Sequence, residues 1–359
     1  MDLQFYVIYC ISLGKVMSKK KVKVGNLVIG DKDIIIQSMT NTKTVDVQGT
    51  VKQILELENA GCELVRCTVP TKESAYALKE IVKSVHIPVV ADIHFSSELA
   101  VLAAENGASK IRINPGNIGD LNKVKYLANF LKEREIPIRI GVNGGSLDQK
   151  FKHLGQVDGM VQSVLEHVHL LEDVNFDDIV ISCKSSNVFN MIEAYRKLSK
   201  IVDYPMHIGV TEAGTYNQGL IKNAIGIGAL LKDNIGDTIR VSLTDDPVKE
   251  IYAAQDILKA CNLYNRPYCE IISCPTCGRT EINVKEFAEN IEAYCKNIKK
   301  NVKIAVMGCI VNGIGESEGA DFGVAGGKER SIIFKDGKKI ETIDNSQILP
   351  RLKELIDKY

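Results

Sequence analysis

The sequence lacks several features that would place it in a specialised class of protein. Lysine plus arginine and aspartate plus glutamate each number 45, so the 359-residue chain carries no surplus of positive charge. Because proteins that bind nucleic acids usually show such a surplus, we expect no nucleic-acid partner. No apolar run reaches the ~18 residues of a membrane span, which favours a cytoplasmic protein with no membrane partner. Ten cysteines are too dilute for a disulfide scaffold, so we expect free thiols except where a metal binds them.

The first residues imitate a signal peptide without having its flanks. The stretch Leu3–Leu13 is apolar, but the only charge before it is Asp2, and Met17-Ser18-Lys19 follows where a small-residue cleavage site would lie. We therefore interpret Met17 as a plausible start, with the preceding 16 residues as an extension. We place the first domain boundary after Ser18, so residues 1–18 are treated as an N-terminal extension and the next domain starts at Lys19.

Residues 19–264 repeat one pattern, a short β-branched run followed by a turn and an amphipathic stretch with helical spacing. Eight strands are expected, at Ile34–Met39, Glu63–Thr68, Pro88–His94, Lys110–Pro115, Pro137–Val142, Asp178–Cys183, Pro205–Val210 and Asp237–Ser242. Eight such units favour a closed (β/α)8 barrel of the TIM type over an open doubly wound sheet, which stays the alternative.

After Tyr264 the pattern changes, and residues 265–359 are predicted to be a separate small α+β domain. We expect strands at Cys269–Ser273 and Val302–Met307, a helix from Val284, and a glycine-rich loop from Gly308 to Gly327. A hairpin at residues 331–342 and a closing helix at residues 346–359 follow. Pro350 falls within that helix, which either starts there or kinks.

Side-chain alternation along the expected barrel strands separates an apolar face from a polar one. In a barrel the polar face points into the lumen, at whose C-terminal mouth such enzymes work. The substrate-binding candidates are the polar residues Arg66, Asp92, His94, Arg112, Asn114, Arg139, Asn143, Lys184, His207, Arg240 and Ser242.

Cations predominate on this polar face. Any one arginine there could simply pair with a carboxylate, but together the cations outnumber Asp92 and Glu212, and burying that surplus without an anion is costly. A diphosphate would satisfy the surplus, since arginine forks suit phosphate oxygens. His94 and His207 are candidates for proton donors or for hydrogen bonding inside the lumen.

Three cysteines of the second domain form a candidate metal site. Cys274-Pro275-Thr276-Cys277 places two thiols on one turn, and Cys309 follows an expected strand. The pair alone would fit a zinc knuckle, an iron–sulfur site or a redox pair. No histidine occurs after His207, which weakens zinc and favours an iron–sulfur cluster with one iron bound by something other than sulfur. Glu316 is the nearest flexible carboxylate, although spacing alone does not choose it over Glu318 or Asp321. Cys269 and Cys295 are interpreted as core thiols.

Nine sequence blocks follow one another along the chain: VRCTVP (65–70), ADIHF (91–95), KIRINPGNIG (110–119), IRIGVNGGSL (138–147), ISCKSSN (181–187), HIGVTEAGT (207–215), IRVSLTDDP (239–247), SCPTCGRTEI (273–282) and MGCIVNGIGESEGADFGVAGG (307–327). In this order, the blocks resemble the 4-hydroxy-3-methylbut-2-enyl diphosphate synthase family. The resemblance runs from about Lys19 to the C-terminus and is to the shorter bacterial two-domain form.

The resemblance implies a barrel followed by a domain similar to sulfite and nitrite reductase modules. That domain would carry a [4Fe–4S] cluster held by Cys274, Cys277, Cys309 and Glu316. The implied reaction is reductive ring opening and dehydration of 2-C-methyl-D-erythritol 2,4-cyclodiphosphate in isoprenoid synthesis, with ferredoxin or flavodoxin as electron donor. Glu316 and Glu212 are the catalytic candidates, Glu212 as an acid. A homodimer is implied, in which the cluster domain of one subunit caps the barrel of the other.

Two alternative functions come from other classes. One is a barrel enzyme such as an aldolase or a pterin-binding methyltransferase with a zinc-knuckle tail. The other is a protein that binds a phosphate ligand or an iron–sulfur cluster without turnover.

Overall fold

The computed structural model describes residues 20–359 except 94–95, 114–120, 297, 312–314, 316 and 318. The chain divides into two compact units between Tyr264 and Asn265. Each unit has its own hydrophobic core. Among the described residues, no helix combines the length and apolar character needed to cross a bilayer.

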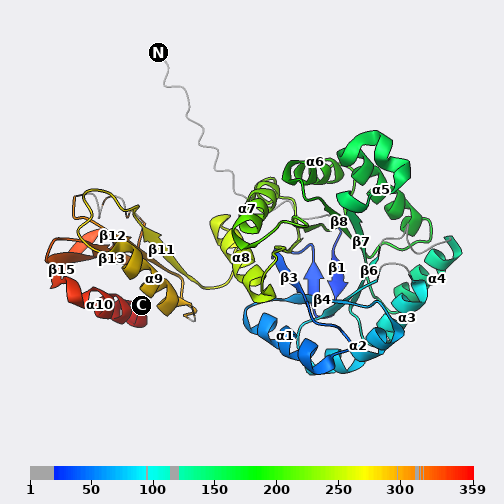
Figure 1. Cartoon of the computed structure of the whole chain (residues 1–359), viewed down its shortest axis with the longest axis horizontal. Helices are drawn as coiled ribbons and strands as arrows, with labels where there is room; N and C mark the ends of the chain where they lie inside the picture. The colour runs from blue at the N-terminus through cyan, green and yellow to red at the C-terminus, as the bar shows by residue number, and fades with distance from the viewer. Residues whose placement is uncertain are drawn as a thin grey trace, which may run out of the picture. The chain divides into compact units, whose positions relative to one another are not determined.

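The first unit is a parallel eight-stranded barrel surrounded by helices, as the repeated pattern predicted (Figure 1). Its strands are β3 (Ile35–Met39), β4 (Leu64–Thr68), β5 (Val89–Asp92), β6 (Lys110–Ile113), β7 (Ile138–Asn143), β8 (Ile179–Lys184), β9 (His207–Ile208) and β10 (Thr238–Ile239). The sheet order is β8-β7-β6-β5-β4-β3-β10-β9, and a parallel bridge between Ile181 and Met206 joins its two edges. The α/β barrel class is therefore confirmed, and the open sheet is excluded.

Eight α-helices of this unit alternate with the strands. They are α1 (Val47–Asn59), α2 (Lys72–Ser84), α3 (Ser97–Glu105), α4 (Leu121–Lys132), α5 (Gly155–Glu172), α6 (Val188–Leu198), α7 (Tyr216–Lys232) and α8 (Pro247–Ala260), with 3-10 turns η2 (Gly144–Ser146) and η3 (Gln149–Leu154) after β7. Several begin at side-chain caps: Asp46, Thr71 and Ser96 each accept a backbone N–H three residues on. The local sequence thus sets where each helix starts.

The apolar face of the strands packs against the helices. Val65, Ile111, Ile140 and Ile181 are fully buried in the main core of this unit, as alternation predicted. The polar alternate residues therefore face the lumen: Asp92, Asn143 and Lys184 end their strands, whereas Lys110 and His207 begin theirs.

A hairpin that the sequence analysis did not predict precedes the barrel. Strands β1 (Val22–Val24) and β2 (Leu27–Ile29) pair antiparallel around Gly25, whose φ of 58° suits glycine. The hairpin packs against Ile35 and Leu64, at the start of barrel strands, in a separate apolar cluster. Strands of three residues show too little alternation to be recognised in a sequence.

The second unit is a five-stranded sheet with two helices. Its elements are β11 (Cys269–Ser273), α9 (Val284–Cys295), β12 (Val302–Met307), β13 (Phe322–Ala325), β14 (Arg330–Lys335), β15 (Lys338–Asp344), the 3-10 turn η4 (Asn345–Gln347) and α10 (Ile348–Lys358). The order is β11-β12-β13-β14-β15, parallel for the first three strands and antiparallel thereafter. Helices α9 and α10 share one core with the sheet.

Two details of this unit differ from the sequence prediction. The expected loop from Gly308 to Gly327 contains strand β13, which was missed because Gly323 interrupts the β-branched pattern. A Cβ at Gly323 would lie 2.3 Å from the Ala305 carbonyl oxygen, so the close strand pairing requires glycine. Helix α10 begins two residues before Pro350, which lies in the first turn, where proline is tolerated.

Candidate functional site

The predicted cations lie at neighbouring positions on the lumen side of the barrel. Strand register places Asp92 beside Arg112, Arg112 beside Arg139, and Asn143 beside Lys184. Adjacent parallel strands lie about 4.8 Å apart, so these side chains share one region. The structure thus brings together residues as far apart in the sequence as Asp92 and Lys184, which are separated by 92 positions.

Asp92 neutralises part of the positive charge. Its buried carboxylate lies 3.0 Å from Arg112 Nη1 and 3.6 Å from Arg66 Nε. Arg112 also donates to the carbonyl oxygen of Gly141 at 3.3 Å. A Cβ at Gly141 would lie 2.4 Å from Arg112 Nε, so glycine makes room for this guanidinium.

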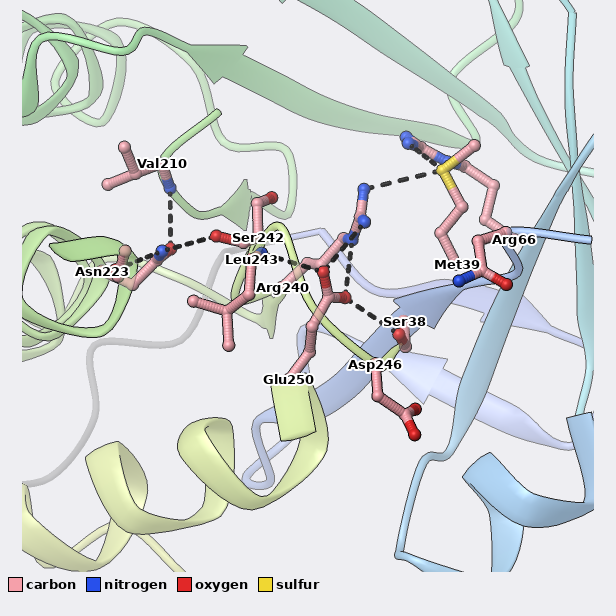
Figure 2. Close-up of polar contacts among 12 residues, drawn as sticks. Ser38, Met39, Arg66, Val210, Asn223, Arg240, Ser242, Leu243, Asp246 and Glu250 are labelled. Carbon is pink, nitrogen blue, oxygen red and sulfur yellow. Dashed lines mark hydrogen bonds and ion pairs between the residues drawn. The ribbon is translucent and has the colours of Figure 1, made fainter. Parts of the chain in front are cut away.

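Arg240 is held by a carboxylate that the sequence analysis did not select. Figure 2 shows Glu250 of α8 facing Arg240, with Nη2 3.2 Å from Oε1 and Nε 3.3 Å from Oε2. On the other side, Met39 Sδ lies 3.6 Å from Arg240 Nη1 and 2.7 Å from Arg66 Nη2. Two guanidinium groups therefore approach one neutral sulfur atom.

Three further cations have no carboxylate partner among the described residues. Lys110 is 0% exposed and Arg139 is 1% exposed, and Lys110 Nζ and Arg139 Nε and Nη1 make no hydrogen bond. Lys184 is buried as well. Burial lowers the pKa of all three well below its ordinary value, and neighbouring arginines lower it further. Leaving such groups without an anion is costly, so the site is suited to bind one.

Lys110 was not among the sequence candidates although a signal for it existed. It lies two residues before Arg112 and so points to the same face of the strand. Glu250, in contrast, sits in the first turn of α8, where an acidic residue usually stabilises a helix N-terminus. Its role in the lumen is visible only in three dimensions.

His207 is a hydrogen-bonding residue of the barrel interior. It is fully buried, and Nδ1 lies 2.7 Å from Thr238 Oγ1. Burial first, and then the charges of Lys184 and Arg139, hold its pKa well below 6.5. Of the two roles considered from sequence, these observations favour hydrogen bonding by a neutral ring over proton donation.

The remaining described candidates lie in or beside the strand-end loops. Glu212 is exposed in the turn after β9, and its backbone has φ of 52°, a left-handed conformation uncommon for glutamate. Asn143 ends β7 and is half-buried, as is Ser242 after β10. The predicted residues His94, Asn114 and Glu316 lie outside the described residues.

Asn223 holds two of these loops together. This fully buried residue of α7 accepts from the Val210 N–H at 3.3 Å and donates to the Ser242 carbonyl at 3.2 Å (Figure 2). It also donates to the carbonyl of Gly219 on its own helix at 2.9 Å. The amide thereby ties the segment after β9 to the segment after β10.

The cysteine turn of the second unit lies beside the end of β12. Gly308 N–H donates to Cys274 Sγ at 3.1 Å, and Glu281 N–H donates to the Gly308 carbonyl at 2.8 Å. Because Gly308 precedes Cys309, these bonds bring the Cys274–Cys277 turn next to the third cysteine. A backbone hydrogen bond near Arg279 lowers the pKa of the exposed Cys277 thiol, which favours the thiolate.

The thiols suit an iron–sulfur cluster by their chemistry and their shared location. None of the nine cysteines that the structure describes forms a disulfide, and Cys295 and Cys269 pack in or against the core of this unit as expected. No three Cys, His, Asp or Glu side chains within the described residues lie close enough to ligate one ion as they stand. Cys274, Cys277 and Cys309 are nevertheless the thiols that hydrogen bonding gathers at this strand end.

Solved structures share the fold of the first unit. A dihydropteroate synthase from Stenotrophomonas maltophilia matches with a TM-score of 0.52 at 14% identity, over 67% of this chain and 97% of that chain. A dihydropteroate synthase from Yersinia pestis matches with a TM-score of 0.50 at 12% identity, over 67% and 98%. At this identity the likeness shows the barrel fold alone.

Relatives in sequence are much closer. A 4-hydroxy-3-methylbut-2-en-1-yl diphosphate synthase (flavodoxin) from Fusobacterium nucleatum is 54% identical over 339 residues, 93% of this chain and 96% of the relative. The enzyme of that name from Clostridium perfringens is 53% identical, over 94% and 98%. The family model of the GcpE TIM-barrel domain matches residues 19–255, and that of the GcpE protein C-terminal domain matches residues 270–358. The chain therefore belongs to the GcpE family.

Proposed function

We propose that this protein is an oxidoreductase that converts 2-C-methyl-D-erythritol 2,4-cyclodiphosphate to (E)-4-hydroxy-3-methylbut-2-enyl diphosphate. The substrate takes up two electrons and two protons, its ring opens and one water leaves. The observation that supports this most directly is the set of buried cations without carboxylate partners, Lys110, Arg139 and Lys184, on a chain of the GcpE family. The names of the relatives support flavodoxin as the electron donor.

In this proposal the barrel binds the two phosphates and orients the carbon skeleton. Arg139 and Lys184 supply charge from the buried lumen, and Arg66, Arg112 and Arg240, oriented by Asp92 or Glu250, supply guanidinium N–H groups that suit phosphate oxygens. The polar candidates that complete the set are Asp92, Asn143, His207 and Ser242, with His94 and Asn114 outside the described residues. Holding the ring in one orientation removes much of the entropic cost of reaction.

The second unit is proposed to hold a [4Fe–4S] cluster through Cys274, Cys277, Cys309 and Glu316. Such a cluster would deliver electrons one at a time, which suits reductive cleavage of a C–O bond. Glu212 is the proposed proton donor among the described residues, since it is exposed in a strained turn at the mouth of the barrel. The proposed location is the cytoplasm, where thiols stay reduced.

An anaerobic assay tests the proposed function. The purified protein is reconstituted with iron and sulfide, reduced flavodoxin and the cyclic diphosphate are added, and the allylic diphosphate is measured by mass spectrometry. We expect about four iron atoms per chain and product formation that depends on flavodoxin. One zinc per chain without product would favour the barrel enzyme with a zinc-knuckle tail, and tight binding without product would favour the non-catalytic alternative.

The proposed functional unit is a homodimer in which each barrel works with the cluster domain of the other subunit. Co-expressing Arg139→Gln with Cys309→Ser tests it, because only a mixed dimer would pair an intact barrel with an intact cluster domain. We expect about one quarter of wild-type activity from random pairing, since half of the dimers are mixed and each has one working site. Absence of activity in the purified mixed dimer would contradict this arrangement.

A further inference from the structure

Glu250 is a buried carboxylate at the mouth of the barrel that none of the proposed roles uses. It projects from the first turn of α8 and is 3% exposed. Oε2 accepts from Ser38 Oγ at 3.0 Å and Arg240 Nε at 3.3 Å, and Oε1 accepts from Arg240 Nη2 at 3.2 Å and the Leu243 N–H at 3.0 Å (Figure 2). Each carboxylate oxygen therefore accepts two hydrogen bonds.

This saturation explains how a charged carboxylate can stay buried. A carboxylate removed from water is costly unless its oxygens are hydrogen-bonded and its charge is paired. Arg240 supplies the charge through a two-point contact, which fixes the plane of the guanidinium as well as its distance. The other two donors come from separate strand ends, Ser38 in β3 and Leu243 after β10.

The rest of Arg240's surroundings would hold it only weakly. Its Nη1 has Met39 Sδ at 3.6 Å, and a thioether is a poor acceptor. Arg66, which shares that sulfur, has Asp92 as its own partner. The electrostatic effect of Glu250 is also felt by Lys184, where it opposes the lowering of the pKa by the surrounding cations. The position of Arg240 thus depends on Glu250.

The same carboxylate anchors the loop that carries Ser242. Glu250 holds the Leu243 N–H, while Asn223 holds the Ser242 carbonyl. The segment 240–243 is therefore fixed at a side chain and at two backbone groups. If Glu250 were lost, both a guanidinium and a hydroxyl of the proposed substrate site would lose their fixed position.

We propose that Glu250 is the positioning residue of the phosphate site: it fixes Arg240 and the backbone of Ser242–Leu243 for binding one phosphate of the substrate without touching the substrate itself. This inference deepens the proposed function and rests on it. Because Nε and Nη2 are occupied by Glu250, Arg240 presents Nη1 to the anion, on the side where Arg66 approaches.

A double-mutant cycle tests this role with inorganic diphosphate as the probe. Glu250→Gln replaces an acceptor by an amide that cannot satisfy four donors, so we expect the dissociation constant to rise about 30-fold. In an Arg240→Met background the same change should alter binding less than about twofold, because its effect acts through Arg240. Asp256→Asn, an exposed carboxylate on the same helix paired with Lys259, is the control and should bind like wild type.

Kinetics and a milder variant separate positioning from folding. With the cyclic diphosphate, Glu250→Gln should raise KM about 30-fold and change kcat much less, since the loss is in binding. Ser38→Ala removes one of the four donors and should raise the dissociation constant about threefold with a smaller loss of thermal stability than Glu250→Gln, which keeps the test open if Glu250→Gln does not fold. The inference would be overturned if Glu250→Gln bound inorganic diphosphate as tightly as wild type. It would also be overturned if Glu250→Gln weakened diphosphate binding by the same factor in the Arg240→Met background as in the wild-type background. Absence of turnover by the wild type would instead overturn the proposed function, while the diphosphate cycle would still report on Glu250.

Discussion

At the residue scale, the site is defined by which buried charges have partners. Arg112, Arg66 and Arg240 are paired with Asp92 or Glu250, whereas Lys110 and Arg139 have no carboxylate within the described parts of the chain. Their charges can be balanced by an anion, and the paired arginines are held ready to add hydrogen bonds to it. The buried cations thus fall into two groups, those that a carboxylate pairs with and orients and those whose charge no described carboxylate balances.

Gly141 is predicted to leave the space that the guanidinium of Arg112 occupies. In Gly141→Ala the new methyl group would meet Arg112 Nε at 2.4 Å, so the guanidinium must move from its contact with Asp92. We expect KM for the cyclic diphosphate to rise about tenfold with unchanged iron content. Gly228→Ala in α7, where the nearest atom is 3.9 Å away, is the control. Equal KM values for the two variants would contradict the prediction.

His167 is predicted to make stability depend on pH. It is buried in α5, and desolvation lowers its pKa from 6.5 to about 4. The unfolded chain therefore binds a proton at a higher pH than the folded chain, and the stability that His167 contributes is present above pH 6.5 and lost as pH falls toward 4.

Denaturant unfolding at pH 7 and pH 4 measures this effect. Between these values the wild type should lose about 3 kcal/mol more unfolding free energy than His167→Gln. The exposed His169→Gln should keep the wild-type dependence. A loss of the same size in wild type and His167→Gln would exclude this cause.

At the element scale, strand alternation allowed much of the site to be predicted from sequence. Barrel strands expose one face to helices, so Arg66, Arg112 and Arg139 could be assigned to the lumen from spacing alone. The ends of β9 and β10 could not be predicted in this way, because both strands are shorter than the apolar patterns in the sequence. Gly209, with φ of 149°, turns the chain just after β9. Glu250 was missed because helical spacing does not reveal which strand end a helix residue reaches.

Asn223 is predicted to couple the elements that bear Glu212 and Ser242. Asn223→Leu keeps the approximate volume but removes both bonds to the Val210 and Ser242 backbones, leaving those groups buried without partners. We expect the free energy of unfolding to fall by about 2–4 kcal/mol and kcat/KM to fall by at least about tenfold. Circular dichroism and steady-state assays give the two values. A stable variant with normal kcat/KM would show that the loops are held by other contacts.

At the scale of the whole molecule, the two units have separate cores and separate chemical equipment. The barrel carries the uncompensated cations, and the second unit carries the three gathered cysteines. The resemblance found in sequence motifs is confirmed by family models that match both units. Composition and strand spacing alone could not have separated this family from other barrels, which share the fold at 14% identity.

Because the cores are separate, anion binding is predicted to survive loss of the metal site. Cys309→Ser in the full-length protein should lower the iron content and abolish turnover. Its affinity for inorganic diphosphate should stay within about twofold of the wild-type value, since the barrel core is untouched. Loss of diphosphate binding together with iron would contradict the division of roles.

The affinity of the barrel for the cyclic diphosphate tests the central claim most directly. Calorimetric titration of wild type, Arg139→Gln and the exposed control Arg134→Gln measures it under anaerobic conditions, with iron content determined in each sample. We predict that Arg139→Gln binds at least about 100-fold more weakly while keeping its iron, because it removes an uncompensated buried cation. An Arg139→Gln protein that binds the cyclic diphosphate as tightly as wild type would contradict the account.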